Sequence, residues 1–169
     1  MMKVKIADSN ADVGREFPFS FTSSAQELDM VQAEYSIDGP IEVQGTIVNT
    51  GHQYRLQGKI KCLKSFVCDR CLGHFTEKQH HRFSEDFRLG EDGEEEESTV
   101  NYFNGDAIDI ADMVRDTILA AQPLNNICRS DCRGLCPKCG ADLNQGDCGC
   151  DRFAPDPRLA ALQHLLKKK

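Results

Sequence analysis

The sequence predicts an α+β fold in which an antiparallel sheet, or a small partly open barrel, is combined with two amphipathic helices and a cysteine-rich C-terminal segment. Three observations lead to this prediction. Apolar and polar residues alternate between residues 41 and 87, apolar residues recur at helical spacing in two later stretches, and six of the nine cysteines lie between Cys128 and Cys150. With 169 residues and 40% hydrophobic content, the chain can build one medium core with a small appendage.

The expected strands follow one another with short links, which is typical of an antiparallel sheet. The clearest hairpin turns at Asn49-Thr50-Gly51-His52, because alternating apolar residues precede and follow this turn. Residues 2–21 are expected to form two short strands, or one strand and an extended arm. The strands that follow are expected at 41–47, 54–62, 61–67 and 74–87. The sequence Cys68-Asp69-Arg70-Cys71 would then lie at the connection between the last two.

Two stretches have the pattern of amphipathic helices. The first starts after Asp109, a residue type that caps helix N-termini, and stops at Pro123. The second, residues 156–169, opens with Asp-Pro and places leucines at helical spacing before three final lysines. Before the first helix, the run GEDGEEEES at residues 90–98 has no apolar residue and predicts a mobile, solvated loop.

The charge of the chain is unevenly distributed. The formal net charge is −7, but the acids of residues 91–97 account for most of it. Between His52 and Arg82 there are seven Lys or Arg against two acids, and eight basic residues oppose five acids from Cys128 onward. Two cysteine-bearing segments are therefore locally basic within an acidic protein.

The cysteine pattern indicates metal binding. Cys136-Pro-Lys-Cys139-Gly has the spacing of a zinc knuckle, in which Gly140 can adopt the positive φ that lets the chain leave the turn. Cys148 and Cys150 are the natural second pair, although a single intervening residue is a less usual spacing.

The remaining cysteines predict a second site. Cys68 with Cys71 and Cys128 with Cys132 make another four-thiol set, so we expect two zinc ions and leave Cys62 as a buried apolar residue. A competing grouping uses Cys128 or Cys132 in the knuckle and leaves the first pair without metal. Disulfides are a minor alternative, and an iron–sulfur cluster would also accept four thiolates.

No catalytic motif accompanies these cysteines. A zinc ion with four cysteine ligands has no open position for water, which is typical of a structural site, and no phosphate loop, nucleophile elbow or H-E-x-x-H sequence is present. The first residues lack the apolar run of a secretory signal, and no stretch reaches transmembrane length, so we expect a cytoplasmic protein without membrane contact. No small-molecule substrate is evident.

The segments VCDRCL, IDIADMVRDTILAAQPLNNIC, DCRGLCPKCGADLNQGDCGC and DPRLAALQHL resemble the YceD family of large ribosomal RNA subunit accumulation proteins. The resemblance is dense from about residue 60 to the C-terminus. It implies a bacterial or plastid protein that supports large-subunit ribosomal RNA. Some relatives keep the pair matching Cys68 and Cys71 without the knuckle, which agrees with two separable metal sites.

Resemblance and charge together favour a non-catalytic ribosome-assembly factor that contacts precursor ribosomal RNA or a ribosomal protein. Zinc would hold basic side chains where they can contact phosphates. The expected contact residues are Arg70, Arg129, Arg133, Lys138, Arg152 and Arg158. Two alternatives stay open: a zinc-stabilised adaptor that binds protein without RNA, and a thiol oxidoreductase that uses Cys68 and Cys71.

These expectations divide the chain into three parts. We predict an α+β domain over residues 1–125 that carries the acidic loop, a zinc-binding segment over residues 126–155, and a C-terminal helix over residues 156–169 that packs back on the domain.

Overall fold

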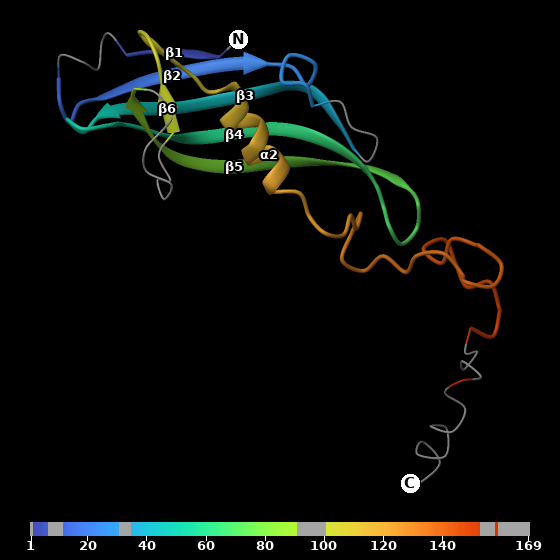
Figure 1. Ribbon diagram of the computed structural model, residues 1–169. Helices are drawn as coiled ribbons and strands as arrows, with labels where there is room; N and C mark the ends of the chain where they lie inside the picture. Colours follow the sequence, from blue (N-terminus) through green and yellow to red (C-terminus); the bar gives the residue numbers. More distant parts are fainter. Residues whose placement is uncertain (1, 7–11, 31–34, 91–100, 153–157, 159–169) are drawn as a thin grey trace. The chain divides into compact units, whose positions relative to one another are not determined.

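A computed structural model describes residues 2–6, 12–30, 35–90, 101–152 and 158 (Figure 1). The chain divides into two compact units: Met1–Val67 with His74–Asn126, which we call the sheet unit, and Cys68–Gly73 with Ile127–Lys169, which we call the cysteine unit. The elements are β1 (Lys3–Lys5), β2 (Glu16–Ser23), β3 (Tyr35–Asn49), β4 (Tyr54–Val67), β5 (His74–Leu89), β6 (Asn101–Phe103), β7 (Ala107–Asp109) and α2 (Ala111–Ala120).

The sheet unit is built on a five-stranded sheet with the order β2-β3-β4-β5-β6. The pairs from β2 to β5 are antiparallel, as predicted, whereas β6 adds to β5 in parallel. A separate two-stranded sheet pairs β1 with β7. Both sheets are open, so of the two predicted architectures the structure supports the sheet rather than a barrel.

The predicted strands 54–62 and 61–67 are wrong as separate elements, because β4 runs through both. Every second residue of β4 faces the core, and this alternation continues through Lys64, a buried residue whose polarity hid the pattern. The neighbouring strand β3 is interrupted by a register shift between Asp38 and Glu42, where Gly39 has a positive φ and Pro40 has no N–H to donate.

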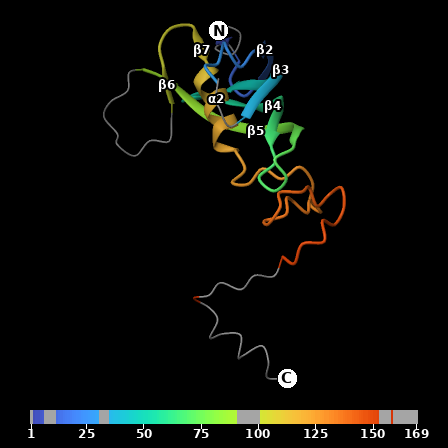
Figure 2. The same cartoon turned by 90° about the vertical axis from the view of Figure 1, so that its right-hand side faces the viewer.

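The core lies between one face of the five-stranded sheet and α2 (Figures 1 and 2). Val114 and Ile118 of α2 are fully buried, and they belong to the same apolar cluster as Ile41, Leu56 and Ile60 of the sheet. We call this the inner face of the sheet and the opposite side the outer face. In the described chain α2 is the single helix longer than one turn.

Two facing glycines allow aromatic rings to cover the inner face. Gly45 and Gly58 are directly paired across β3 and β4, and a Cβ on Gly58 would lie 2.3 Å from the carbonyl oxygen of Gln44. The rings of Phe19 and Phe83 stack near this position with centroids 6.5 Å apart. A larger residue at either glycine would displace backbone, not only a flexible side chain.

Lys64 holds the C-terminal end of α2. Its Nζ donates hydrogen bonds to the carbonyl oxygen of Ile118 at 3.3 Å and to Oε1 of Gln122 at 2.6 Å. The last carbonyls of a helix have no partner within the helix, so a buried cation there stabilises them. Burial lowers the pKa of the Lys64 ammonium.

The helix begins one residue later than expected. Asp109 is the last residue of β7, where it pairs with Lys3, and Ile110 occupies the N-cap position. The Asp109 carboxylate still accepts a hydrogen bond from the Ala111 N–H at 3.1 Å. The local signal therefore located the helix, while pairing with the distant β1 moved its boundary.

Three expectations extend beyond the described part of the chain. The acidic run falls almost wholly outside the described residues, and so does the second helix, of which only Arg158 is described. The division at residues 1–125, 126–155 and 156–169 stays a prediction. Among the described helices, none is both long and apolar enough to cross a membrane.

Candidate metal centres

The knuckle sequence forms the turn that its spacing predicts. The N–H of Cys136 donates to the carbonyl of Ala141 at 2.8 Å, and the N–H of Gly140 donates back to the carbonyl of Cys136 at 2.9 Å. Gly140 has the expected positive φ, 74°. The turn closes a short loop that brings two thiols to one side.

Four thiols of this region lie within 4.8 Å of one another, and they belong to Cys136, Cys139, Cys148 and Cys150. We call them the knuckle cluster. The glycines around Cys148 and Cys150 let the chain fold back to the knuckle, and Gly149 has a φ of 70°. The less usual C-x-C spacing is therefore compatible with one shared ion.

A second set of four thiols also lies within 4.8 Å and consists of Cys68, Cys71, Cys128 and Cys132. We call it the long-range cluster. Its Sγ atoms are 3.9 Å apart between Cys68 and Cys132 and 3.8 Å apart between Cys71 and Cys128. All eight cysteines thus come together in the grouping preferred from sequence, and the competing grouping is not the one that forms.

These spacings fit a single tetrahedral ion. Thiolates about 2.3 Å from a zinc ion are about 3.8 Å from one another at tetrahedral angles. A disulfide requires sulfurs about 2.05 Å apart, and all nine cysteines are free. A multi-iron cluster would separate thiolates bound to different irons. The donor set therefore suits one mononuclear thiophilic ion in each cluster; that the ion is zinc stays a prediction.

The long-range cluster is positioned by a tight turn and a close backbone approach. The Cys68 N–H donates to the Gly73 carbonyl at 2.9 Å, and the Leu135 N–H donates to the Arg70 carbonyl at 3.0 Å. Gly134 has a φ of 71°, and a Cβ there would lie 2.8 Å from the same Arg70 oxygen. Only glycine fits this contact without strain.

Hydrogen bonds from backbone N–H groups stabilise the thiolate form of one cysteine in each cluster. Burial raises the pKa of Cys68, but the N–H groups of Cys128, Cys71 and Arg70 outweigh it and lower that pKa to about 6. In the knuckle cluster, the N–H groups of Cys139 and Lys138 lower the pKa of Cys136 to about 6.

In each cluster another thiol favours its proton, Cys128 in the long-range cluster and Cys150 in the knuckle cluster. Burial, followed by the neighbouring thiols, raises the pKa of Cys128 to about 12, and the adjacent thiols of Cys139 and Cys148 raise that of Cys150 to about 12. A bound cation supplies the positive charge that four thiolates need.

Asn144 is a supporting residue that the sequence analysis missed. Its Nδ2 lies 3.6 Å from Sγ of Cys132, and its Oδ1 accepts hydrogen bonds from the Arg133 N–H and the Arg129 guanidinium. Asp142 holds the Asn144 amide through a 2.7 Å hydrogen bond. Such second contacts orient metal ligands, and the available signal was a polar Asp-x-Asn spacing between two cysteine pairs.

The predicted RNA- or partner-contacting residues fall into two groups. Arg70, Arg129 and Arg152 are engaged within the cysteine unit, by the Cys132 carbonyl, by Asn144 and Asp131, and by Asp147. Arg133 and Lys138 are exposed, and within the described residues their side chains form no ion pair. Arg158 is exposed and has a contact of its own. Contact with RNA or a partner stays a prediction for all six.

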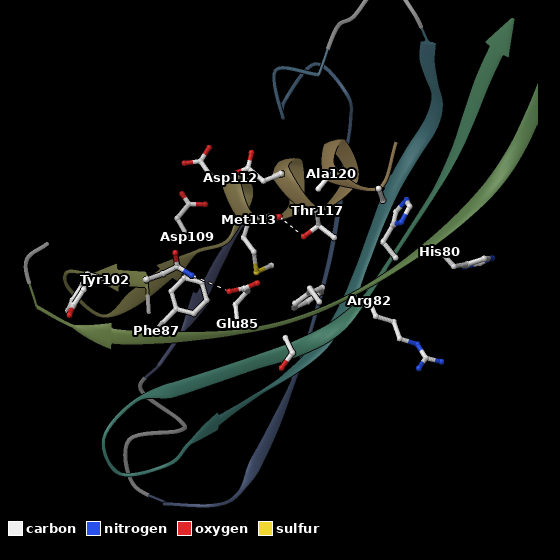
Figure 3. A pocket seen from close by; sticks show the side chains of 16 residues that line it. His80, Arg82, Glu85, Phe87, Tyr102, Asp109, Asp112, Met113, Thr117 and Ala120 are labelled. Carbon is white, nitrogen blue, oxygen red and sulfur yellow. Dashed lines mark hydrogen bonds between the residues drawn. The ribbon is translucent and has the colours of Figure 1, made fainter. Parts of the chain in front are cut away.

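A groove of about 930 Å³ lies beside α2, along β5 and β6 (Figure 3). Glu85, Asp112 and Thr117 contribute polar groups, and Phe87 and Met113 contribute apolar surface. Most of these polar groups are already engaged: an ion pair at 3.0 Å joins Asp112 to the neighbouring arginine, and the Thr117 hydroxyl donates to the Met113 carbonyl. Among the described lining residues, no hydrogen bond links a histidine to a carboxylate.

One protein family and several individual proteins are similar to this chain. The model of the family described as "Large ribosomal RNA subunit accumulation protein YceD" matches residues 56–166. The "Large ribosomal RNA subunit accumulation protein YCED homolog 1, chloroplastic" of Arabidopsis thaliana is 27% identical over 80% of this chain. The uncharacterized protein YlbN of Bacillus subtilis is 27% identical over 91% of the chain, and an uncharacterized protein of Mycobacterium tuberculosis is 31% identical over 59%.

These relatives differ in length. The chain spans 51% of the Arabidopsis protein and 49% of the mycobacterial protein, but 90% of the Bacillus protein. No solved structure matches the chain significantly.

Proposed function

The chain belongs to the YceD family of large ribosomal RNA subunit accumulation proteins, as its motifs indicated, and on this premise we propose that it is a non-catalytic factor supporting accumulation and assembly of large-subunit ribosomal RNA. The match over residues 56–166 is the observation that carries the proposal, because it includes both cysteine clusters. We place this activity in the cytoplasm; the word chloroplastic belongs to the name of the plant relative.

The chemistry of the clusters supports a structural role for metal. Each cluster offers four thiols, which complete the coordination of a tetrahedral zinc ion and leave no position for a reacting water. Cys68, Cys71, Cys128 and Cys132 would hold one ion, and Cys136, Cys139, Cys148 and Cys150 the other. When bound, zinc supplies folding free energy to a segment that buries few apolar side chains.

The partner in this proposal is precursor ribosomal RNA or a ribosomal protein. Arg133 and Lys138 are the best candidates of the cysteine unit, since both are exposed and neither side chain is neutralised within the described residues. Arg70 and Arg129 instead hold the long-range cluster through Cys132 and Asn144, so their loss would act through metal binding.

A protein-binding adaptor without RNA contact is the second candidate. The groove beside α2 favours it, because the carboxylates of Glu85 and Asp109, which form no ion pair within the described residues, lie beside apolar surface and suit a basic protein segment. Recovery of partners from cells before and after nuclease treatment separates the candidates, since a protein contact survives the nuclease and an RNA tether does not.

Depletion and complementation test the function itself. In a host depleted of its own copy, the wild-type chain should restore the ratio of large- to small-subunit ribosomal RNA. Cys68→Ser and Cys136→Ser should fail, and Cys62→Ala, which removes a thiol outside both clusters, should succeed. Full restoration by both cluster variants would refute the metal-dependent factor. Reversible oxidation of Cys68 and Cys71 in metal-loaded protein would instead favour the oxidoreductase.

A further inference from the structure

The outer face of the five-stranded sheet carries a group of cations that the sequence did not bring together. Cross-strand pairing in β4 and β5 places Lys59 opposite Arg82 and Lys61 opposite His80, with Lys78 one pair further along. All of these residues are exposed. Figure 3 shows the Arg82 side chain directed away from α2. We call Lys59, Lys61, Lys78 and Arg82 the outer-face cluster.

The outer-face cluster is not neutralised by the described part of the chain. None of its four side chains forms an ion pair or hydrogen bond there, although Glu42 pairs with Lys61 in the strand register. Two acids, Asp38 and Glu42, therefore lie beside four cations, and both line the hollow that contains Lys61 and Lys78. Neighbouring outer-face positions are mostly uncharged and polar, including Gln44, Gln57 and Ser84.

The same two strands also contain a cross-strand pair of opposite charges. Two positions beyond Gln57, Arg55 lies opposite Asp86 and donates to both carboxylate oxygens, at 2.8 and 3.0 Å. Lys59 and Arg82 occupy the equivalent cross-strand relation with like charges, which destabilises a sheet. An anionic ligand on this face would relieve that repulsion.

The surface around the cluster is hollowed in two places. Lys59 and Arg82 line one hollow of about 720 Å³ with Gln44, Gln57 and Ser84. Lys61 and Lys78 line another of about 600 Å³ together with the acids Asp38 and Glu42. The first hollow combines cations, amides and a hydroxyl, which are the donors that contact phosphate oxygens in nucleic-acid complexes.

The positions of the aromatic residues determine which part of an RNA molecule the outer face can contact. The described outer-face positions of β2 to β5 contain no Phe or Tyr, because Phe19, Phe21, Phe66 and Phe83 belong to the inner face. Recognition of unpaired bases relies on stacking against aromatic rings. This face can contact the sugar–phosphate backbone but offers no platform for bases.

We propose that the outer face of the sheet, through Lys59, Lys61, Lys78 and Arg82, binds the phosphate backbone of base-paired RNA. This inference deepens the proposed function and rests on it, since it supplies an RNA-contacting surface separate from the cysteine unit. Binding is sequence-independent and falls steeply with salt, because each contact releases counterions.

The test uses the full metal-loaded chain and a fluorescently labelled RNA hairpin with a stem of roughly 20 base pairs. Anisotropy titrations over a salt series compare wild type with the double variant Lys59→Gln/Arg82→Gln. Losing two phosphate contacts should reduce the slope of log K against log salt by about 2, and the affinity at 0.1 M salt by roughly 50-fold. Arg55→Gln, whose cation is already paired, should change the affinity less than about twofold.

Stability separates a binding defect from misfolding. The double variant removes a repulsive pair, so its thermal unfolding midpoint should equal or exceed that of wild type. Unchanged RNA affinity in this variant, with loss of binding in Arg133→Gln/Lys138→Gln, would overturn the inference and leave the proposed function intact. A wild-type chain that does not bind the hairpin overturns RNA contact altogether. Displacement of the hairpin by polyglutamate at lower charge concentration than by unlabelled hairpin would assign the face to an acidic protein segment and also overturn it.

Discussion

The two clusters should contribute unequally to stability, because their ions close loops of very different length. An ion in the long-range cluster joins residues 57 to 64 positions apart, such as Cys71 with Cys128. An ion in the knuckle cluster joins Cys139 to Cys148, only nine positions away. Loop closure restricts the unfolded chain more as the loop lengthens.

The chain-entropy relation for cross-links gives the size of the difference. By restricting the unfolded chain, closure of the longer loop raises the free energy of the unfolded state by about 4 kcal/mol at 25 °C, and closure of the shorter loop raises it by about 2.5 kcal/mol. The difference, about 1.6 kcal/mol, depends only on the ratio of loop lengths. Loss of the long-range ion should therefore destabilise the chain more than loss of the knuckle ion.

The perturbations are Cys68→Ser and Cys139→Ser, with Cys62→Ala as the control. Elemental analysis should find two zinc ions per wild-type chain, one in each cluster variant and two in the control. Urea unfolding without chelator should then place Cys68→Ser below Cys139→Ser by the stated difference. Two ions retained in Cys68→Ser would refute the long-range site, and equal stabilities with one ion each would refute the loop-closure argument.

Three further predictions follow from the packing and the hydrogen bonds. Gly58→Ala should lower the free energy of unfolding by about 1–3 kcal/mol in urea titrations, because its Cβ meets the Gln44 carbonyl and the Phe83 ring. Lys64→Met should lower it by about 1 kcal/mol, since the last carbonyls of α2 lose a buried donor. Asn144→Ala should weaken zinc binding at the long-range cluster by roughly 10- to 100-fold in chelator competition, because Asn144 orients Cys132.

Each of these has a matched control on the same chain. Gly146→Ala, where a Cβ meets nothing within 4 Å, should leave stability nearly unchanged. Lys61 is exposed on the same strand as Lys64, so Lys61→Met should change the free energy of unfolding by less than about 0.5 kcal/mol. The Gln145 side chain donates a hydrogen bond to Asp142 but contacts no thiol, so Gln145→Ala should not alter zinc affinity. If a control variant changed stability or zinc affinity as much as its test variant, the physical cause given for the test variant would be refuted.

The features that could be predicted from the sequence are those encoded by near neighbours. Alternation around the turn at residues 49–52 predicted the β3–β4 hairpin, and helical spacing predicted α2, because each depends on residues a few positions apart. The same holds for the knuckle, where Pro137 and Gly140 belong to one turn. The boundary at Asp109 was missed because β1, more than a hundred residues earlier, pairs there.

The sequence by itself therefore determined the family, the antiparallel hairpins and the division of eight cysteines into short pairs, since local spacing restricts what a short chain segment can bind or bury. Only the tertiary structure decided that Cys68 and Cys71 meet Cys128 and Cys132, and that Asn144 supports them. It also decided that Lys59 and Arg82 share one face, because strand register selects which distant side chains become neighbours.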